Sequence, residues 1–361
     1  MLGAKMDGSL NKIGPKTNPR ISDVARVAGV STATVSRVLS NPGMVSAKTR
    51  DHVLAAVTET GYRINLAARN LRRRQSGGIV VLVPHLSNPF FSQILSGIAR
   101  VASEAGLNVL VADTREPEGA DRQIADYLFN NRADGLIVLD GNLPESMFKP
   151  PHSDRDMPPV IFACEWVEGH DEPAVTIDNR HGAALAVEHL IALGHRRIGH
   201  IMGPRDNILT RQRADGVRDA LSAAGLEADQ RWFLDGDFTL ASGIAAAPHW
   251  LALDERPTAV FCSSDAMACG FMSELNRHGV QVPGDVSVVG FDDIEIAAHF
   301  IPALTTIRQP RGAIGEVAAG MLLDLMRGPD KDGKPAEGGS RTLPIELIVR
   351  NSTAAPNPSR T

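Results

Sequence analysis

The sequence predicts an N-terminal all-α helix-turn-helix headpiece with a hinge helix, followed by an α/β body of two doubly wound lobes. A helical hairpin near the N-terminus indicates the headpiece. From residue 79 onward, apolar runs alternate with helical stretches, as parallel strands alternate with crossover helices. Charge divides the chain at the same place: residues 1–75 hold 13 of the 37 Lys and Arg but only 4 of the 42 Asp and Glu. A basic head on an acidic body is typical of a polyanion-binding module joined to another domain.

The hairpin over residues 21–39 predicts the first two headpiece helices. Residues 21–28 carry an apolar stripe, and Gly29 allows a tight turn after them. Ser31 is a favoured N-cap residue whose hydroxyl can accept the backbone N–H of Thr34, so a second helix should begin there. Two short helices joined by a glycine turn are typical of a helix-turn-helix, whose second helix enters the DNA major groove.

The second helix has two unlike faces. Helical spacing forms an apolar face from Val35, Val38 and Leu39. The opposite face carries small, hydroxyl-bearing or cationic side chains, namely Thr32, Ala33, Ser36 and Arg37. The alternative interpretation is an ordinary core hairpin, which needs larger apolar side chains on all sides. The composition of the second face disfavours that alternative.

A third helix is expected from the cap residue Ser46 to about Thr60, with Gly61 as its stop. Three of its apolar residues should face inward: Val53, Leu54 and Val57. The headpiece then spans residues 20–62. Residues 1–19 have no apolar stretch of the kind that signal peptides carry, and we expect them to be a disordered arm.

Residues 63–77 are predicted to form a hinge helix and linker. A helix of about two turns is followed by a cationic run at 72–74 and two glycines. Helices this short are unstable in isolation, so the hinge should order only when something holds it. Leu71 lies among arginines and has two interpretations, ordinary packing or a wedge between base steps in the minor groove.

The body is predicted as two strand-and-helix sets. The first has strands at 79–83, 108–112, 135–139 and 159–164, with helices at 89–106 and 119–131. The second has helices at 180–194, 211–225, 240–252 and 266–278, with strands at 197–202, 232–234, 259–262 and 287–291. A helix at 311–326 and a strand at 346–350 return to the lobes. We therefore expect one lobe over 78–177 plus 308–340, the other over 178–307 plus 341–353, and a flexible tail over 354–361.

Several function classes have little support in the sequence. No apolar run is long enough for a membrane span, and no G-x-G-x-x-G, Walker A or G-x-S-x-G motif occurs. The three cysteines have no metal-binding spacing and are expected to be reduced, as in a cytoplasm. We expect no cofactor, no metal and no membrane contact. In open α/β sheets, ligands bind beyond the carboxyl ends of the strands, here in a cleft between the lobes.

Along residues 20–353 the chain resembles the LacI/GalR family of repressors, and within it the cytidine- and purine-repressor branch. The resemblance is carried by Asp23–Ala25, Gly29–Arg37, Asn88–Phe91, Gly194–His195, Ser264–Ala268, Val289–Asp292 and Leu304–Pro310. It implies a periplasmic-binding-protein-like core whose small ligand, a sugar or nucleoside, changes the affinity for DNA. It also implies a homodimer that reads a palindromic operator, with paired hinge helices in the central minor groove.

The resemblance assigns DNA-binding roles residue by residue. Base edges should face Thr32, Ala33 and Arg37, and Arg37 is the best candidate to read guanine. The phosphate backbone should be held by Ser31, Thr34, Asn41, Lys48 and Arg50. In the hinge, Ala68 and Leu71 should contact DNA, and Leu71 matches the family's intercalating leucine. Ile64 departs from the family pattern, because many relatives have proline just before the hinge helix.

The resemblance also implies a ligand-binding set in the cleft: Asn88, Phe90, Phe91, Glu165, Arg211, Phe238, Asp265 and Asp292. Asp292 ends an apolar strand and can accept two ligand hydroxyls. Arg211 offers a planar donor fork, and Phe238 or Phe91 offers a stacking face. For Phe90 and Phe91 the alternative is core packing. For Arg211 it is a surface salt bridge, because Arg213 nearby can play either role.

Together these features predict a cytoplasmic, ligand-responsive transcriptional regulator, a repressor and not an enzyme. No heptad pattern follows the last strand, so a dimer is expected. Two alternatives come from other classes. A periplasmic solute-binding protein would share the core but would lack the basic headpiece. A two-lobe hydrolase acting on a nucleoside or glycoside would have to use the cleft carboxylates Glu165, Asp265 and Asp292.

Overall fold

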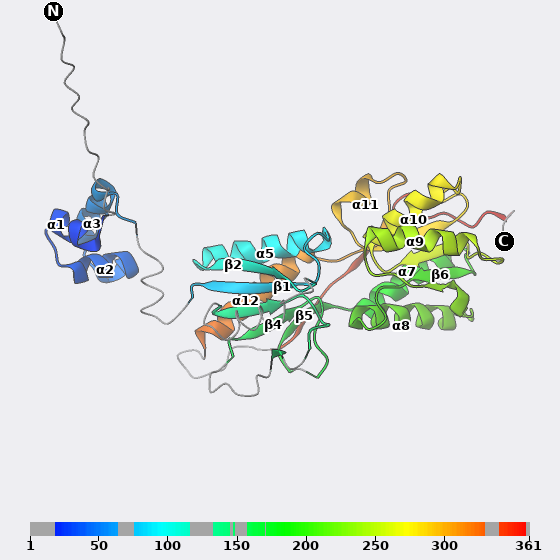
Figure 1. Cartoon of the computed structure of the whole chain (residues 1–361), viewed down its shortest axis with the longest axis horizontal. Helices are drawn as coiled ribbons and strands as arrows, with labels where there is room; N and C mark the ends of the chain where they lie inside the picture. The colour runs from blue at the N-terminus through cyan, green and yellow to red at the C-terminus, as the bar shows by residue number, and fades with distance from the viewer. Residues whose placement is uncertain are drawn as a thin grey trace, which may run out of the picture. The chain divides into compact units, whose positions relative to one another are not determined.

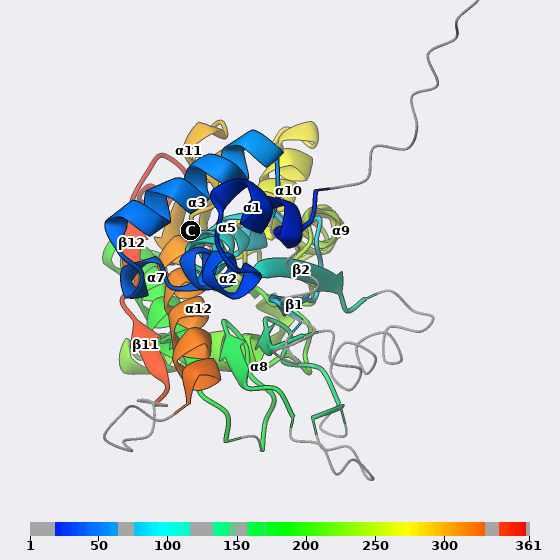
Figure 2. The same ribbon diagram turned by 90° about the vertical axis from the view of Figure 1, so that its left-hand side faces the viewer.

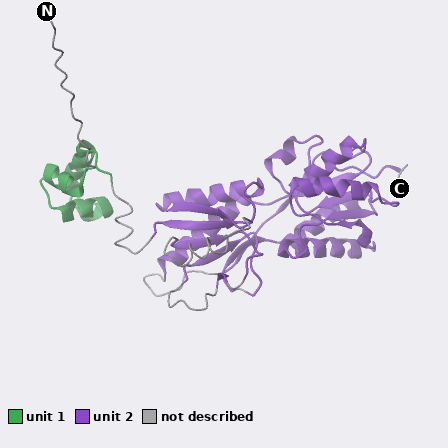
Figure 3. Cartoon of the chain, in the orientation of Figure 1, with its two compact units in different colours: residues 1–72 green, residues 73–361 purple. Residues whose placement is uncertain are grey.

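The structure is a computed structural model that describes residues 19–63, 76–115, 133–144, 147–148, 157–169, 171–328 and 339–358. The chain divides into two compact units, residues 1–72 and 73–361 (Figure 3). Several predictions lie outside the described residues: the arm over 1–18, the hinge helix with Ile64, Ala68 and Leu71, the helix at 119–131, and the last three residues. No helix within the described ranges is long and apolar enough to span a bilayer.

The headpiece contains three α-helices, α1 (Ile21–Ala28), α2 (Thr32–Ser40) and α3 (Ala47–Thr60), with a short 3₁₀ turn, η1 (Pro42–Met44), before α3. Its predicted caps are confirmed. The Ser31 hydroxyl accepts the Thr34 N–H at 3.1 Å, Ser46 caps α3, and Gly29 and Gly61 have positive φ values. One interior prediction is wrong: Leu54 is 46% exposed, and Ala56 is buried beside Val53 instead. Ala56 lies three residues after Val53 and so shares its face of α3.

The first lobe is a six-stranded parallel sheet in the order β11-β5-β4-β3-β1-β2 (Figures 1 and 2). Its strands are β1 (Gly78–Val83), β2 (Asn108–Asp113), β3 (Gly135–Val138), β4 (Val160–Ala163), β5 (Ala174–Ile177) and β11 (Arg341–Leu343). Helices α5 (Phe90–Glu104) and α12 (Arg311–Arg327) pack on each other, and α12 packs on β3, β4 and β5. Glycines make this close helix contact possible, because a Cβ on Gly315 would lie 2.1 Å from the Ile94 carbonyl oxygen.

The second lobe is a six-stranded sheet in the order β12-β10-β9-β8-β6-β7, in which only β12 is antiparallel. Its strands are β6 (Ile198–Ile201), β7 (Phe233–Leu234), β8 (Ala259–Cys262), β9 (Ser287–Asp292), β10 (Thr305–Arg308) and β12 (Glu346–Ile348). Its helices are α7 (Asn179–Ala192), α8 (Ile208–Ala223), α9 (Leu240–Leu251), α10 (Asp265–Arg277) and α11 (Glu295–His299), with η3 (Gln230–Trp232) before β7. Helices α7 and α8 form one packed pair, and α9 and α10 form another.

The chain passes between the lobes three times, after β5, after β10 and after β11. The predicted lobe boundary at residue 341 is therefore wrong, because β11 pairs with β5 in the first lobe. The predicted start of a free tail at 354 is also wrong: the Ala354 carbonyl accepts hydrogen bonds from His195 at 2.9 Å and from Ser287 at 3.1 Å. Elements β5, β10, β11 and α11 were not predicted.

Candidate functional site

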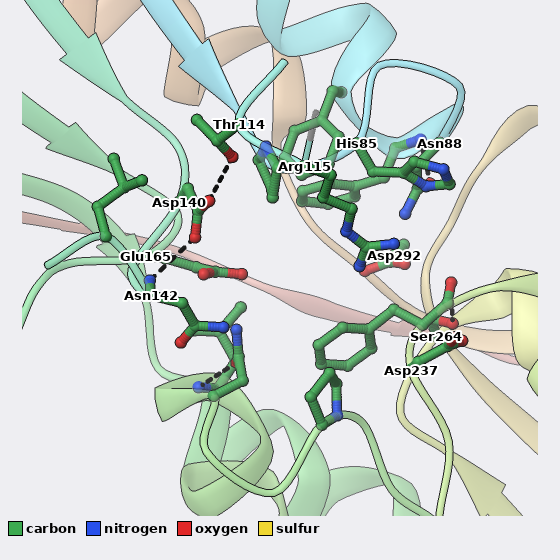
Figure 4. A pocket seen from close by; sticks show the side chains of 18 of the residues that line it. His85, Asn88, Thr114, Arg115, Asp140, Asn142, Glu165, Asp237, Ser264 and Asp292 are labelled. Carbon is green, nitrogen blue, oxygen red and sulfur yellow. Dashed lines mark hydrogen bonds between the residues drawn. The ribbon is translucent and has the colours of Figure 1, made fainter. Parts of the chain in front are cut away.

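A pocket of about 330 Å³ lies between the two lobes (Figure 4). Its first-lobe wall comes mainly from residues that follow β1, β2, β3 and β4, and its second-lobe wall from residues that follow β6, β7 and β8, from the start of α8 and from the last residue of β9. Both parallel sheets thus direct their carboxyl ends at one site, as the fold class predicts. The polar residues of the lining are His85, Asn88, Thr114, Arg115, Asp140, Asn142, Glu165, Asn207, Arg213, Asp237, Ser264 and Asp292.

Two carboxyl groups, Asp140 and Glu165, form the first-lobe end of the pocket. The Asp140 carboxylate accepts the Thr114 hydroxyl and the Asn142 backbone N–H, the latter at 2.9 Å. Glu165 Oε2 accepts the backbone N–H of Gly141, also at 2.9 Å. These contacts fix both carboxyl groups and leave acceptor positions facing the pocket.

Glu165 also accepts a hydrogen bond from Asn207 of the second lobe. The side-chain oxygen of Asn207 caps α8 by accepting the N–H of Leu209 at 2.9 Å, so its amide nitrogen is the donor to Glu165. Burial raises the pKa of Glu165, and the charge of Asp140 adds to this rise, whereas the hydrogen bonds from Gly141 and Asn207 lower it. The resulting pKa is about 7. Glu165 therefore changes charge near neutral pH, and its two states suit different ligand groups.

Asp292 forms the second-lobe end of the pocket, at the last position of β9. Its Oδ1 accepts a hydrogen bond from Gln309 Nε2 at 2.7 Å. Burial raises the pKa of Asp292 to about 6, although the charges of Arg213 and Arg311 and the Gln309 hydrogen bond all lower it. The ionised carboxylate, held by Gln309, can accept hydrogen bonds from hydroxyl groups.

Arg213 is the buried arginine of the lining. Its Nε donates to the Asn179 side chain at 3.0 Å, and its Nη1 donates to the Ser263 carbonyl. The guanidinium carbon lies 3.8 Å from the centre of the Phe291 ring and 5.7 Å from that of Phe238. Burial lowers the pKa of Arg213, and the charges of Asp292 and Glu165 oppose this shift. The side chain is thus held at one angle by packing as well as by hydrogen bonds.

Three aromatic side chains also line the pocket. Phe238 lines the second-lobe side, and its ring occupies the space that glycine leaves at 203, where a Cβ would lie 2.2 Å away. Phe90 and Phe91 line the first-lobe side, edge to face at a centroid distance of 5.0 Å. These rings give the pocket apolar surface against which a flat ring can pack. Phe90 and Phe91 are also buried members of the hydrophobic core, so the alternative of core packing holds for them as well.

Backbone strain is concentrated at this site. In the described part of the chain, four non-glycine residues have positive φ: Cys164, Phe238, Asp292 and Asp293. Two of them line the pocket, and the other two adjoin Glu165 and Asp292. Strained backbone of this kind persists where the surrounding structure fixes a functional geometry.

Six of the eight residues predicted for the ligand site lie around this pocket: Asn88, Phe90, Phe91, Glu165, Phe238 and Asp292. Arg211 does not. Its guanidinium extends outward to the Asp206 carbonyl and forms an ion pair with Glu168 of the first lobe at 2.8 Å. Asp265 does not line the pocket either, because it is fully buried beneath it and accepts the Thr306 hydroxyl and the Ile294 N–H.

The pocket residues that were not predicted include Asp140, Asn207, Arg213 and Asp237. Asp140 and Asp237 follow strands and Asn207 caps α8, so their positions at element ends are the signal that could have found them, whereas Arg213 lies on the buried stripe of α8. The acidic lining residues Asp140, Glu165, Asp237 and Asp292 outnumber the arginines, Arg115 and Arg213. Despite burial, hydrogen bonds from Thr239 and Ser242 keep the pKa of Asp237 below its ordinary value, so this residue remains ionised.

The headpiece presents a second candidate site, on α2. Thr32, Ala33 and Arg37 are exposed on the face opposite the buried Val35 and Val38. In the described part of the chain no ion pair holds the Arg37 guanidinium. Ser31 and Thr34 share a hydrogen bond between their hydroxyls at 2.9 Å. Of the other predicted phosphate contacts, Asn41 and Lys48 are exposed, and Arg50 is half-buried beside Asp51 at 3.6 Å.

Comparisons with known proteins match both parts. The family described as bacterial regulatory proteins of the lacI family matches residues 20–65, and the periplasmic binding protein-like domain matches residues 187–353. The transcriptional repressor CytR of Escherichia coli K12 is 40% identical over 340 residues, which are 94% of this chain and 98% of that protein. The repressor PurR of Photobacterium profundum is 33% identical, over 92% and 98% of the two chains.

Solved structures agree. The Lac repressor dimer bound to operator and the anti-inducer ONPF has a TM-score of 0.80 at 32% identity, covering 94% of this chain and 100% of that one. The regulator CelR in complex with cellobiose has a TM-score of 0.69 at 32% identity, covering 93% and 100%. Headpiece, two-lobe core and near full-length similarity to repressors lead to one conclusion. The chain belongs to the lacI family of bacterial regulatory proteins and is a DNA-binding transcriptional regulator with a ligand-binding core.

Proposed function

We propose that this regulator is a repressor whose operator affinity is controlled by a nucleoside bound between the lobes. The observation that carries the proposal is the combination of groups in the pocket lining. The rings of Phe238, Phe90 and Phe91 line the same pocket as Asp292 and Arg213 of the second lobe and Asp140 and Glu165 of the first. A nucleoside combines the matching parts, with a hydroxyl-rich sugar, a flat ring and a polar base edge.

Each end suits one part of the ligand. At the second-lobe end, Asp292 can accept ribose hydroxyls while the Arg213 fork donates to their oxygens. At the first-lobe end, the acceptors of Asp140 and Glu165 match an amino group on the base. The sugar would have to be unphosphorylated, because four acidic side chains against two arginines repel an added anion. A free sugar is the second candidate, favoured by the cellobiose in the CelR structure.

The proposal is tested by thermal unfolding of the full chain with cytidine, adenosine, uridine, ribose, cellobiose and cytidine monophosphate. A ligand that binds only the native state stabilises it by about 2.7 kcal/mol at 100 times its dissociation constant. We expect cytidine or adenosine to raise the unfolding temperature by several degrees, and the monophosphate and both sugars to have little effect. A shift with the sugars alone would contradict the nucleoside proposal.

Ligand control follows from linkage. If a nucleoside prefers one arrangement of the lobes and operator DNA another, each lowers the affinity for the other by the same factor, typically 5- to 150-fold. If both prefer the same arrangement, the ligand acts as a co-repressor instead. The binding role needs no catalysis, and we propose that the chain acts on DNA in the cytoplasm without turning over its ligand. Hydrolysis of a nucleoside by the pure protein would contradict this.

For DNA recognition we propose that Arg37 reads one base pair in each half of a palindromic operator. Arg37→Ala should then weaken binding by about 1–3 kcal/mol per half-site and relax the sequence preference at that position only. Competition binding with operators altered at single positions measures this. Lys48→Ala is the control, because a phosphate contact should weaken all sequences alike and reduce the salt dependence. A uniform loss for Arg37→Ala would make Arg37 a phosphate contact.

We further propose that the operator-bound form is a homodimer, as the Lac repressor is in its complex with operator and ONPF. Beside the end of α10 lies a groove of about 510 Å³, lined in part by Met272, Val280 and Phe300. Ile301 belongs to the same lining and is 92% exposed. A two-fold dimer contact joins the same surface of both protomers, and an exposed apolar side chain beside a mixed polar and apolar groove suits such a contact. Sedimentation equilibrium should give twice the chain mass of 38.6 kDa.

A further inference from the structure

One connection between the lobes also holds the loop that follows β9. This crossover segment, residues 308–311, joins β10 of the second lobe to α12 of the first. Arg308 Nε donates to the Asp293 carboxylate at 2.7 Å, and Gln309 Nε2 donates to the Asp292 carboxylate at 2.7 Å. The pocket carboxylate and the connection between the lobes therefore share hydrogen bonds.

Arg311 is the member of this segment that contacts both lobes. It is 5% exposed, and its Nη2 donates to the Asp293 carbonyl at 2.9 Å in the second lobe. Its Nη1 lies 3.4 Å from the carbonyl oxygens of Pro89 and Phe90, at the start of α5 in the first lobe. Phe90 lines the pocket, and Asp293 follows the pocket residue Asp292. The planar guanidinium of Arg311 therefore contacts backbone carbonyl groups of both lobes, next to residues that line the pocket.

We propose that Arg311 is a positioning residue that couples ligand contact at Asp292 to the angle between the lobes. The inference rests on the pocket being the ligand site, as proposed above. Asp292 and Asp293 have φ values of 124° and 52°, so the backbone between the pocket carboxylate and the Arg311 contact is held in a strained conformation. A ligand that moves the Asp292 carboxylate moves the adjoining Asp293 carbonyl with it. Because its fork is rigid, Arg311 carries that movement to Pro89 and Phe90.

Burial makes this link resistant to rupture. Among the described residues, the Arg311 guanidinium donates to carbonyl oxygens only, and none of the ion pairs includes it. A buried cation that loses such hydrogen bonds leaves donors unpaired away from water, which is costly. The favourable response to movement of the Asp293 carbonyl is for the lobes to follow it.

Arg350 provides a matched control. Its Nη2 donates to the Asp293 carboxylate at 2.7 Å, and its Nη1 donates to the Leu304 carbonyl at 2.8 Å. The chemistry resembles that of Arg311, and both contact Asp293. Arg350 and its partners, however, lie in the second lobe alone. Replacing Arg350 removes one of the two guanidinium groups on the Asp293 carboxylate while Arg308 still holds it, and it breaks no hydrogen bond between the lobes.

The test compares full-length Arg311→Met and Arg350→Met chains with the native protein. Spin labels are placed on α5 and α8 at the exposed positions 103 and 222, as Ser103→Cys and Ser222→Cys. The three native cysteines are buried and should not be labelled. Mixing with excess unlabelled chain makes the measured distances those within one protomer. Double electron–electron resonance without ligand should show a broader distance distribution between the lobes for Arg311→Met and the native distribution for Arg350→Met.

A native distribution in Arg311→Met, or equal broadening in Arg350→Met, would overturn the proposal. If Arg311→Met does not fold, Arg311→Lys replaces it, because a single ammonium keeps the charge but cannot span both lobes.

The second readout is the ratio of operator dissociation constants with and without saturating cytidine. Arg311→Met should reduce that ratio at least fivefold at saturation, and Arg350→Met should preserve it. An unchanged ratio in an Arg311→Met chain that binds cytidine would also overturn the proposal. If cytidine binds none of the chains, the nucleoside proposal fails, and the ligand-free distances still decide the role of Arg311.

Discussion

Replacing Arg213 with methionine is expected to weaken nucleoside binding by about two orders of magnitude or more. Arg213 is buried in the pocket lining close to Asp292, where its fork can make charge-assisted hydrogen bonds worth about 1.5–3 kcal/mol each. Two such bonds correspond to a factor of about 100 or more, at 1.4 kcal/mol per tenfold. The charge that supports the ionised form of Asp292 is lost as well. Isothermal titration with cytidine or adenosine measures the loss.

Arg211→Met is the matched control, two residues away on the same helix. Its ion pair with Glu168 joins side chains that are 42% and 68% exposed, and such surface pairs contribute about 0–1 kcal/mol. We expect its nucleoside affinity to stay within about threefold of the native value. Thermal unfolding and operator binding without ligand establish that both variants fold. Equal losses in the two variants would mean that the pocket lining does not define the ligand site.

Arg211 and Arg213 show how much of the site could be predicted from the sequence. The helix was predicted to begin at Arg211, but it begins at Ile208 after the cap residue Asn207. Its buried stripe runs through Leu209, Arg213, Gly216, Val217 and Ala220, at helical spacing. Arg213 lies on that stripe and Arg211 lies outside it. Periodicity therefore contained the answer, but the family resemblance alone did not separate two arginines of the same type.

Long apolar runs and well-capped helices were predictable because each is determined locally. Strands such as β1 and β8 were placed within a residue of their true bounds. The strands β5, β10 and β11 were not, because each has only three or four residues and, unlike the all-apolar β8, contains Thr or Arg, which leaves no continuous apolar run. The assignment of β11 to the first lobe depends on its pairing with β5, a tertiary contact that no local pattern encodes.

The same distinction applies to the site. Asp292 and Glu165 were predictable because Asp292 ends a buried strand and Glu165 follows one, and strand ends define the binding edge of a parallel sheet. Asp265 has the same residue type but is the first residue of α10, beneath the pocket floor, where burial raises its pKa well above the ordinary range. The sequence does not show whether a carboxyl group at a strand or helix end lies at the pocket surface or below it. That depth determines whether the group can contact a ligand or instead holds a loop in place.

The second large expected effect is that the preference between cytidine and uridine depends on pH, because it depends on the charge of Glu165. Burial raises its pKa to about 7, so it changes from mostly neutral at pH 6 to mostly charged at pH 8. The charged form accepts from an amino group, and the neutral form donates to a carbonyl oxygen. Cytidine affinity should therefore rise by up to about tenfold between pH 6 and pH 8, and uridine affinity should fall by up to the same factor. Titration calorimetry at pH 6, 7 and 8 measures both.

The stability of the ligand-free protein is an independent check on the direction of the Glu165 pKa shift. The folded-state pKa lies above the ordinary value of 4.5, so the folded chain holds a proton that the unfolded chain releases between these values. This contribution to the free energy of unfolding is present at pH 4.5 and is lost as the pH rises through 7. Glu165→Gln cannot titrate. In that variant the dependence of stability on pH over this window should be correspondingly weaker.

The ratio of uridine to cytidine dissociation constants isolates the base from the sugar. Asp292, with a pKa of about 6, also titrates in this range, but it should meet the same ribose in both ligands, so its effect cancels in the ratio. In the native chain the ratio should rise with pH, and in Glu165→Gln it should be flat. A rising ratio that survives Glu165→Gln would mean that Glu165 does not select the base. A flat ratio in the native chain would mean that Glu165 does not contact the base edge.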